Sequence, residues 1–323
     1  MRQSTHVKAD VPEVTVVIPT RDRWRFLRRA LDAALRQEDV HAEVVVVDDG
    51  STDETPRRLE ELGDPRVRAI RVDDGRGVGA ARNAGIAAAC GEWIAFLDDD
   101  DIWSPRKLRT QLDALRAAGG GFAYTGAVLL DGSLAAVHIS PAPPPEGLLE
   151  LTRAFNPIPA GSSNVLVHAD LLRRVGLFDE RLHQLADWEL WIRLAGVGPA
   201  VACDEPLVGY VQHAGQMLLA DTTDVFGELR YLDRKHGGPP SSPEGGGNRR
   251  LFWRWAARGD LEAGRNARAA RLALRGEWLH HGRGNSFAGA LVLAWRVLRR
   301  IGRTRHRPGS APLRAPAWVE DYR

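Results

Sequence analysis

The sequence is poor in cysteine, in long apolar runs and in net charge. Cys90 and Cys203 are the only cysteines in 323 residues, which argues against a disulfide framework and favours a reducing compartment. No stretch reaches the ~20 apolar residues that a bilayer-spanning helix needs, and residues 1–10 hold no apolar segment typical of a signal peptide. We therefore expect a cytoplasmic protein.

The near-neutral charge also narrows the function. Lys and Arg total 44 against 42 Asp and Glu, a formal net charge of +2, so the chain is not the strongly basic protein expected of a nucleic-acid binder. Hydrophobic residues make up 44% of the chain, enough to bury one large core, or one core and a smaller C-terminal unit. We expect no nucleic-acid partner.

Strand and helix patterns alternate through the first hundred residues. The predicted strands are 14–18, 44–47, 67–72 and 93–97, and the predicted helices between them are 24–36, 52–62 and 78–89. Continuously apolar strands separated by helices are typical of an α/β fold with a mostly parallel sheet that is covered on both faces.

Beyond residue 101 the pattern becomes mixed. It predicts a helix at 105–118, strands near 122–130, 134–139 and 164–167, a helix at 187–195, two short helices within 251–279, and one more at 286–303. Residues 237–248 are rich in Gly, Pro and Ser, as linkers are. The expected organisation is a tail (1–12), a catalytic domain (13–236, with halves 13–101 and 102–236), a linker (237–248), a helical extension (249–305) and a second tail (306–323).

Four consecutive carboxylates, Asp98 to Asp101, follow the predicted strand 93–97 directly. Adjacent ionised carboxylates repel and raise one another's pKa unless a metal ion or several donors compensate them. Oxygen ligands of this kind suit Mg²⁺, Mn²⁺ or Ca²⁺. The alternative is an acidic surface turn, but ligands of open α/β sheets bind outside the carboxyl ends of the strands. The run is therefore a candidate cation site.

Two further acidic positions lie where the same sheet could bring them to this site. Asp48 and Asp49 follow the second predicted strand, and Asp187 begins a helix that carries tryptophans. Carboxylates at strand ends can accept hydrogen bonds from a base or a ribose, and those on a metal can gather phosphates. A carboxylate that binds no metal is free to act as a general base.

Several motifs together resemble the family 2 glycosyltransferases of the GT-A fold, over about residues 13 to 215. The matching segments are Val17-Ile18-Pro19-Thr20-Arg21-Asp22-Arg23, Val47-Asp48-Asp49-Gly50-Ser51, Gly79-Ala80-Ala81-Arg82-Asn83, Gly91 to Asp101, Val175 to Glu180, and Ala186-Asp187-Trp188-Glu189-Leu190-Trp191. The segment ending in Asp98-Asp99-Asp100-Asp101 is similar to the strand that carries the family's DXD metal site.

The resemblance implies an inverting transfer of sugar from a nucleotide-diphosphate sugar, with UDP favoured, to an acceptor hydroxyl. It implies that Asp187 is the general base and that Asp100 binds a divalent metal, Mn²⁺ or Mg²⁺, with His213 as a second metal or phosphate contact. It places Trp188 and Trp191 on the acceptor side, as pocket walls or core. Donor contacts are implied for Pro19, Thr20, Arg21, Asp49, Arg82, Asp98 and Asp99. The acceptor stays open between a glycan, a lipid-linked glycan and a small molecule.

Two departures from the family pattern affect individual residues. Ala186 stands where many members carry a glutamate before the catalytic aspartate, and Val211 and Gln212 stand before His213 where an arginine is usual. We interpret the first as a tuning difference that leaves activity in place. The second weakens the phosphate contact, so His213 is equally well a structural histidine.

The C-terminal helix expected at 286–303 ends in a basic stretch. A basic amphipathic helix can lie on an anionic membrane surface, which would place the protein at the inner face of the membrane. The alternative is a helix packed on the main domain with a solvated arginine face.

Three other functions would use parts of the same sequence. A haloacid-dehalogenase-like phosphatase would use Asp98 as nucleophile and Asp100 as acid, but it leaves Asp48, Asp49 and Asp187 unexplained. A nicotinamide site could use Gly75-Arg76-Gly77-Val78-Gly79-Ala80, although this glycine pattern is weak and Asp73 and Asp74 would repel a pyrophosphate. A non-catalytic nucleotide-sugar-binding module would not need Asp98, Asp100 and Asp187 together.

Overall fold

The computed structural model describes residues 11–73, 75–213, 225–237, 252–258, 260, 265–281 and 313–323. The chain forms two compact units. The first contains Met1–Glu146, Ile158–Val211 and Ala315–Arg323, and the second contains Gly147–Pro157 and Gln212–Arg314. The predicted linker lies outside the described residues except for Gly237, so that boundary stays a prediction.

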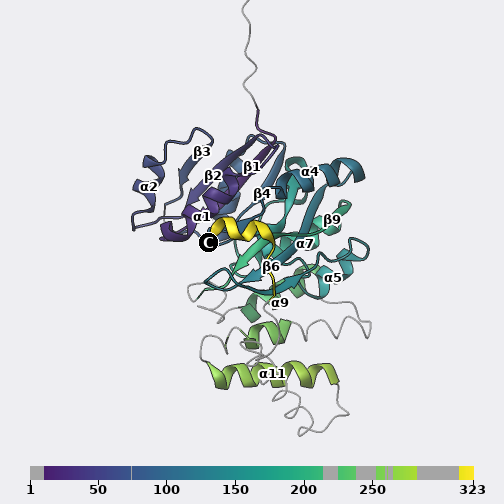
Figure 1. The fold of residues 1–323 in the computed structure, drawn as a ribbon. Coiled ribbons are helices and arrows are strands. Elements are labelled where there is room, and N and C mark those ends of the chain that lie inside the picture. The colour runs from purple at the N-terminus through teal and green to yellow at the C-terminus, as the bar shows by residue number, and fades with distance from the viewer. Residues whose placement is uncertain are drawn as a thin grey trace, which may run out of the picture. The chain divides into compact units, whose positions relative to one another are not determined.

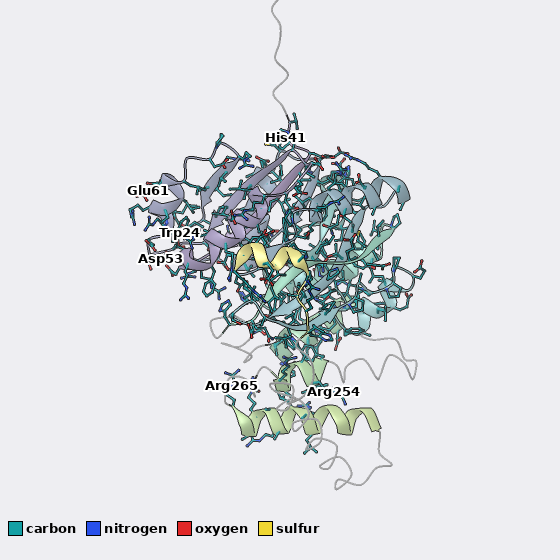
Figure 2. All side chains as sticks on the ribbon, viewed as in Figure 1. Trp24, His41, Asp53, Glu61, Arg254 and Arg265 are labelled. Carbon is teal, nitrogen blue, oxygen red and sulfur yellow. The ribbon has the colours of Figure 1, made fainter. Side chains whose placement is uncertain are left out.

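The first unit begins with the alternation expected from the sequence (Figure 1). Its elements are β1 (Val14–Thr20), α1 (Trp24–Leu35), β2 (Ala42–Asp48), α2 (Thr55–Glu61), β3 (Val67–Arg71), α3 (Val78–Ala88) and β4 (Trp93–Phe96). All four strands run parallel, in the order β3-β2-β1-β4. Figure 2 labels Trp24, Asp53 and Glu61, which mark the start of α1, the loop after β2 and the end of α2.

Helices cover both faces of this parallel region, which explains its continuous apolar strands. On one face of β1, Val14, Val16 and Ile18 share a buried cluster with residues of α1 such as Leu27. On the other face, Gly85 of α3 lies so close to Val17 that a Cβ atom there would overlap the valine methyl. Since neither face of β1 meets water, the strand needs no polar alternation.

The second half of the sheet is mixed. Its elements are β5 (Ile102–Trp103), α4 (Lys107–Ala118), β6 (Phe122–Leu130), β7 (Ala136–Ser140), β8 (Leu166–His168) and β9 (Ala200–Val211). The strand order is β3-β2-β1-β4-β8-β6-β9-β5, with β7 paired to β6. β8 is antiparallel to both β4 and β6, and β5 is antiparallel to β9. The predicted mostly parallel sheet is therefore confirmed for β1 to β4, while the second half carries the antiparallel strands.

β9 was not predicted from the sequence because polar residues interrupt it. Asp204, Glu205 and Pro206 stand in its middle. The pairing of β9 with β6 shifts register there, from Thr125 opposite Cys203 to Gly126 opposite Pro206. Since proline cannot donate to a strand ladder, it is tolerated at such a bulge. The longest described strand therefore reads in sequence like a loop.

Further helices complete the two units. They are α5 (Leu148–Ala154), α6 (Ala169–Val175), α7 (Ala186–Ala195), α9 (Val225–His236), a helical segment at 252–258 and α11 (Asn266–His281). The two helices predicted within 251–279 are confirmed, and the helix predicted at 286–303 lies outside the described residues. Among the described helices, none has the length and apolar character required to span a bilayer.

The last nine residues return to the first unit. They carry the 3-10 helix η3 (Ala317–Tyr322), the yellow segment of Figure 1. Val319 is completely buried, and Trp318 and Tyr322 pack against the main hydrophobic cluster. The Tyr322 hydroxyl donates to the carbonyl of Trp103 at 2.9 Å. The segment 315–323, expected as part of a tail, is thus a structural part of this unit.

We expect Val319→Ala to lower the free energy of unfolding by about 2 kcal/mol, because the substitution removes two buried methyl groups and leaves a cavity. The matched control is Val197→Ala, whose side chain is 49% exposed and should cost under about 0.5 kcal/mol. Urea unfolding followed by tryptophan fluorescence measures both. Equal effects would show that η3 contributes nothing to the stability of the unit.

Candidate functional site

The carboxyl ends of three strands bring the predicted site residues to one edge of the sheet. Thr20 at the end of β1 pairs in register with Asp48 at the end of β2, and Val17 pairs with Phe96 of β4. The aspartate run follows β4 by one residue. Parallel strands thus place the loops after β1, β2 and β4 side by side, where ligands of α/β sheets bind.

Each aspartate of the run has different partners. Asp98 accepts a hydrogen bond from Nη2 of Arg82 at 2.5 Å. Asp99 accepts from the Thr20 hydroxyl at 2.7 Å and from Nη1 of Arg23 at 3.2 Å. The same Arg23 nitrogen donates to Asp100 at 2.9 Å.

Asp101 is held from two directions and is completely buried. Its Oδ2 accepts from the hydroxyl of Ser163 at 2.6 Å, and its Oδ1 accepts from the backbone N–H of Val211 at 3.2 Å. These contacts make Asp101 a structural anchor between the run, the turn at 161–164 and the end of β9.

Charge in the run is compensated by arginine and by protonation. The side chain of Asp98 is 31% exposed, and that of Asp100 is 10% exposed. Burial, reinforced by the charge of Asp100, raises the pKa of Asp99 to about 7. Burial and neighbouring carboxylates also raise the pKa of Asp101 well above its usual range. The run therefore carries fewer than four negative charges at neutral pH, as expected for like charges in close contact.

Asp49 ties the loop after β2 to the start of α3. Its carboxylate accepts from the backbone N–H groups of Arg76 at 2.9 Å and Gly77 at 3.0 Å. Arg21, on the exposed loop after β1, lies against Gly75, where a Cβ atom would overlap its guanidinium. Pro19 lies within β1 itself. The predicted donor residues therefore share one set of connected loops.

Asp187 lies in the first turn of α7, and its carboxylate meets the turn at 161–164. Its Oδ1 accepts from the backbone N–H of Trp188 at 2.6 Å. A Cβ atom built on Gly161 would lie 2.7 Å from Oδ2. Burial raises the pKa of Asp187 to about 6, with Arg82 opposing the shift and Asp98 adding to it. Because the same turn also contacts the aspartate run through Ser163, Asp187 lies beside the predicted donor carboxylates, and its role as a base stays a prediction.

The two tryptophans of α7 are buried. Trp188 is 2% exposed and Trp191 is 0% exposed. This placement fits a role as core and as the wall behind the site. Direct contact with an acceptor stays a prediction.

Glu189 and Arg193 form a buried ion pair on α7. Arg193 contacts both carboxylate oxygens of Glu189, with its Nη2 at 2.7 Å, and Glu189 is completely buried. The same guanidinium donates to the carbonyls of Val175, Gly176 and Leu177. The N–H groups of Arg193 thus bind both Glu189 and the carbonyls of the loop after α6. They fix this loop to the helix that carries Asp187.

We expect Arg193→Met to lower the free energy of unfolding by about 3–5 kcal/mol, because it leaves the Glu189 charge buried without its partner. The control is Arg173→Met, which breaks an ion pair with Asp170 whose side chains are 66% and 75% exposed; such pairs contribute at most about 1 kcal/mol. Urea unfolding of both variants makes the comparison, and similar losses would contradict the role of Glu189 and Arg193.

Asn83 fixes the turn that follows α6 against α3. Its side-chain amide donates to the carbonyl of Phe178 at 3.0 Å and accepts from the Phe178 N–H at 2.9 Å. The Phe178 ring lies 5.2 Å from the guanidinium carbon of Arg82 and packs edge-to-face on Phe96. Arg82, the partner of Asp98, is therefore held by an aromatic ring as well as by a carboxylate.

His213 is half-buried, two residues beyond the end of β9. It falls in the second compact unit, so its part in the site stays a prediction. No group of three or more His, Cys, Asp or Glu side chains in the described part of the chain has an arrangement that could hold a metal ion by itself.

Sequence reasoning did not identify Arg23 or Ser163 as site residues. Arg23 stands in the same segment as Pro19 and Thr20, so a basic residue in the loop facing an acidic run was a readable signal. Ser163 carries no such signal, because only the fold brings it to Asp98 and Asp101, which lie 65 and 62 residues away in the sequence.

Comparisons with known proteins relate part of the sequence to a family. Residues 15–135 match the family model described as glycosyl transferase family 2. The succinoglycan biosynthesis protein ExoO of Rhizobium meliloti is 48% identical over 124 residues, which cover 38% of this chain and 36% of ExoO. The chain thus matches about a third of the length of that relative.

Solved structures show the same fold at low sequence identity. TarS 1–349 of S. aureus, in complex with UDP-GlcNAc, has a TM-score of 0.59 at 14% identity and covers 92% of this chain and 93% of its own. The mannosyltransferase PcManGT of Pyrobaculum calidifontis, with GDP-Man and Mn²⁺, has a TM-score of 0.53 at 20% identity, covering 90% and 86%. These matches confirm the predicted GT-A fold. Residues 15–135 of this chain are thus similar to glycosyltransferase family 2, and the chain as a whole shares the fold of the two solved transferases.

Proposed function

We propose that the protein is a metal-dependent, inverting glycosyltransferase that uses a nucleotide-diphosphate sugar. One observation carries the proposal: the turn at 161–164 contacts the aspartate run, where the Ser163 hydroxyl accepts from the Asp98 N–H at 3.0 Å, and also Asp187, whose Oδ2 would lie 2.7 Å from a Cβ atom on Gly161. A paired set of carboxylates with unequal environments suits a reaction in which one binds the donor and the other moves a proton.

The residues present fit a divalent cation that is completed by its substrate. Mg²⁺ and similar ions are usually held by one or two carboxylates together with phosphates and water, rather than by an all-protein cage. Asp98, whose side chain is 31% exposed, and Asp100, whose side chain is 10% exposed, offer such oxygen ligands. When bound, the ion would neutralise charge on the leaving diphosphate. The Mn²⁺ seen with PcManGT supports the choice of Mn²⁺ or Mg²⁺.

The nucleotide would occupy the connected loops after β1, β2 and β4. Asp49 and Thr20 offer acceptors and a hydroxyl for the nucleoside, while Arg21 and Arg82 offer cations for the phosphates. Asp99 holds Thr20 and Arg23 in position for this role. UDP is the proposed nucleotide, and TarS, which binds UDP-GlcNAc, supports it. GDP and dTDP remain alternatives, and PcManGT with GDP-Man is the example of the first.

Asp187 would remove the proton from the acceptor hydroxyl. The acceptor oxygen then forms a bond to the anomeric carbon while the bond from that carbon to the diphosphate oxygen breaks. Attack on the face opposite the leaving group inverts the anomeric centre. A pKa of about 6 leaves Asp187 largely ionised at neutral pH and yet a stronger base than an ordinary aspartate, as general-base catalysis requires.

The phosphatase alternative explains less of the site. It would need Asp98 as a free nucleophile, but Asp98 is paired with Arg82 and coupled to Asp187. A non-catalytic binding module would need no general base, so it would not explain the raised pKa of Asp187. Phosphate release from sugar phosphates without any nucleotide would favour the phosphatase.

A thermal-shift panel of UDP-, GDP- and dTDP-sugars, each with and without Mn²⁺, tests the proposal. We expect one nucleotide series to raise the melting temperature in the presence of Mn²⁺ and much less in its absence, because only the folded protein binds the pair. Failure of every nucleotide sugar to stabilise the protein with metal would overturn the proposal.

The acceptor would be a glycan, a lipid-linked glycan or a small molecule, and the relation to a succinoglycan biosynthesis protein favours a glycan.

We place the protein in the cytoplasm, in peripheral contact with the membrane. Arginines far outnumber acidic residues between 249 and 307, where the acids are Asp260, Glu262 and Glu277. Two of these arginines, Arg254 and Arg265, are labelled in Figure 2. Salt-sensitive co-sedimentation with anionic but not neutral vesicles is expected; no binding to either would contradict the membrane contact.

A further inference from the structure

The 3-10 turn η1 (Gly161–Asn164) lies between the aspartate run and the helix of Asp187. Ser162 is 1% exposed, and Ser163 and Asn164 are completely buried. Because its three polar side chains are out of water, their hydrogen-bond partners decide what the turn can do. Two of the three contact other parts of the site or of the sheet.

Ser163 contacts the run at both of its ends. Its hydroxyl accepts from the backbone N–H of Asp98 at 3.0 Å and donates to Oδ2 of Asp101 at 2.6 Å. Its carbonyl accepts from the indole N–H of Trp103 at 2.7 Å. One residue thus makes three hydrogen bonds to the segment 98–103, and a serine hydroxyl can donate and accept at the same time.

The turn is fixed to the sheet on its other side by Asn164. The Asn164 side chain accepts from the backbone N–H of Thr125 at 2.5 Å and donates to the carbonyls of Thr125 and Pro159. Thr125 lies within β6. A turn that is tied to a central strand cannot move independently of the sheet, so it provides a rigid reference for what it contacts.

The first residue of the turn, Gly161, lies against Asp187, the proposed general base. Gly161 has a φ of +49°, and a Cβ atom there would lie 2.7 Å from Oδ2 of Asp187. The same four-residue turn therefore contacts the backbone of Asp98, the side chain of Asp101 and the carboxylate of Asp187. No other described contact joins these three groups so directly.

We propose that Ser163 is a positioning residue that fixes Asp98 and Asp100 relative to Asp187. The inference rests on the proposed function and adds a residue that the motifs do not reveal. The hydroxyl of Ser163 fixes both ends of the run, so it determines where the carboxylates between those ends are presented. Gly161 leaves the space in which the Asp187 carboxylate is held, so the turn sets the distance between donor site and base.

Isothermal titration of UDP in the presence of Mn²⁺ tests the role of Ser163 without relying on turnover. We expect Ser163→Ala to weaken Mn²⁺-dependent UDP binding by roughly 10-fold, the effect of losing one or two buried hydrogen bonds. The matched control is Ser162→Ala. Ser162 is adjacent and equally buried, but its hydroxyl has no hydrogen-bond partner within the described residues, so its removal should change affinity less than twofold.

Two further variants separate positioning from a loss of folding. Trp103→Phe removes the indole N–H that donates to the Ser163 carbonyl, together with ring volume at a completely buried position, and should weaken UDP binding in the same direction by a smaller factor. Ser163→Thr keeps the hydroxyl and should restore part of the affinity. Gly161→Ala should lower kcat by a larger factor than it weakens UDP and Mn²⁺ binding, because its Cβ atom meets the Asp187 carboxylate directly and affects the aspartate run only through strain in the turn.

The outcomes distinguish this inference from the proposed function. If the unaltered protein shows no Mn²⁺-dependent binding of UDP, GDP or dTDP, the proposed function fails. If it binds and Ser163→Ala binds equally well, with or without a lower melting temperature, Ser163 is only structural and the inference is wrong. A loss of the same size in Ser162→Ala would also overturn it.

Discussion

Asp187→Asn should reduce kcat by about 10²–10⁴, the usual contribution of a positioned general base, while leaving Mn²⁺-dependent UDP binding within a few-fold of the unaltered protein. The amide keeps the size of the carboxylate and can still accept from the Trp188 N–H, but it cannot take a proton. Asp170→Asn, an exposed aspartate in the first turn of α6, is the matched control. Equal turnover of Asp187→Asn and the control would remove Asp187 from the mechanism.

The pH dependence of the unaltered enzyme gives a second measurement of Asp187. Because the base must be ionised to accept a proton, kcat should rise with pH through about 6 and level off above it. The Asp187→Asn variant should not show this rise of kcat with pH.

The free energy of unfolding should show the opposite dependence on pH. The folded-state pKa of Asp187 lies above the ordinary value of 3.8, so the stability that the protonated carboxyl provides is present below about pH 4 and is lost as pH rises through about 6. Ionisation thus costs on the order of 2–3 kcal/mol at pH 8. We expect Asp187→Asn to melt at a higher temperature than the unaltered protein at pH 8. A lower melting temperature would show that ionisation of Asp187 does not destabilise the folded protein.

Asp100→Ala should weaken Mn²⁺-dependent UDP binding by roughly 100-fold or more and abolish metal-dependent turnover. Outer groups that merely orient a metal ligand cost about 10–100-fold when removed, so loss of a ligand itself should exceed that. Isothermal titration with UDP and Mn²⁺ measures it. Asp113→Ala on α4, 65% exposed, is the control, and comparable affinities in the two variants would exclude Asp100 as a metal ligand.

The same substitution should stabilise the protein in the absence of metal. The charge of Asp100 raises the pKa of both Asp99 and Asp101, so its removal relieves repulsion that those buried carboxyls now experience. A higher melting temperature together with lost binding would distinguish a functional residue from a folding defect.

Asp99→Asn should be milder than Asp100→Ala. Asp99 has a structural role, because it accepts hydrogen bonds from the Thr20 hydroxyl and from Arg23. With a pKa near 7 it already spends much of its time protonated at neutral pH, and an amide resembles that form. Affinities reduced equally in the two variants would contradict this division of roles.

Strands β1, β2 and β4 of the parallel half could be predicted because each is a nearly continuous apolar run that is buried on both faces. Val14 to Ile18 and Val44 to Val47 are buried throughout, and such runs separated by helices have few alternative arrangements. β9 could not be predicted, since Asp204, Glu205 and Pro206 conceal a bulged strand that only its pairing with β6 reveals. The antiparallel insertion of β8 between β4 and β6 depends on the same long-range pairing.

The site was predictable where the chemistry is local. Asp98 to Asp101 and Asp49 follow strands that are readable in sequence, and parallel pairing brings them together. The contacts that set their positions are not local: Ser163 reaches Asp98 from 65 residues away and Arg23 reaches Asp100 from 77. Residues of this kind have ordinary local surroundings, so only the fold identifies them.

The chain leaves the first unit at Val211 and returns to it at Ala315. The second unit, which also includes Gly147–Pro157, is therefore inserted into the first, and segments of the first unit lie on both sides of it in the sequence. Serial truncation from the C-terminus would remove Val319 and Tyr322 before it reached any helix of the second unit. A truncation series would then report damage to the catalytic core as if it were the function of the helices. Internal deletions that retain residues 315–323 avoid this confusion.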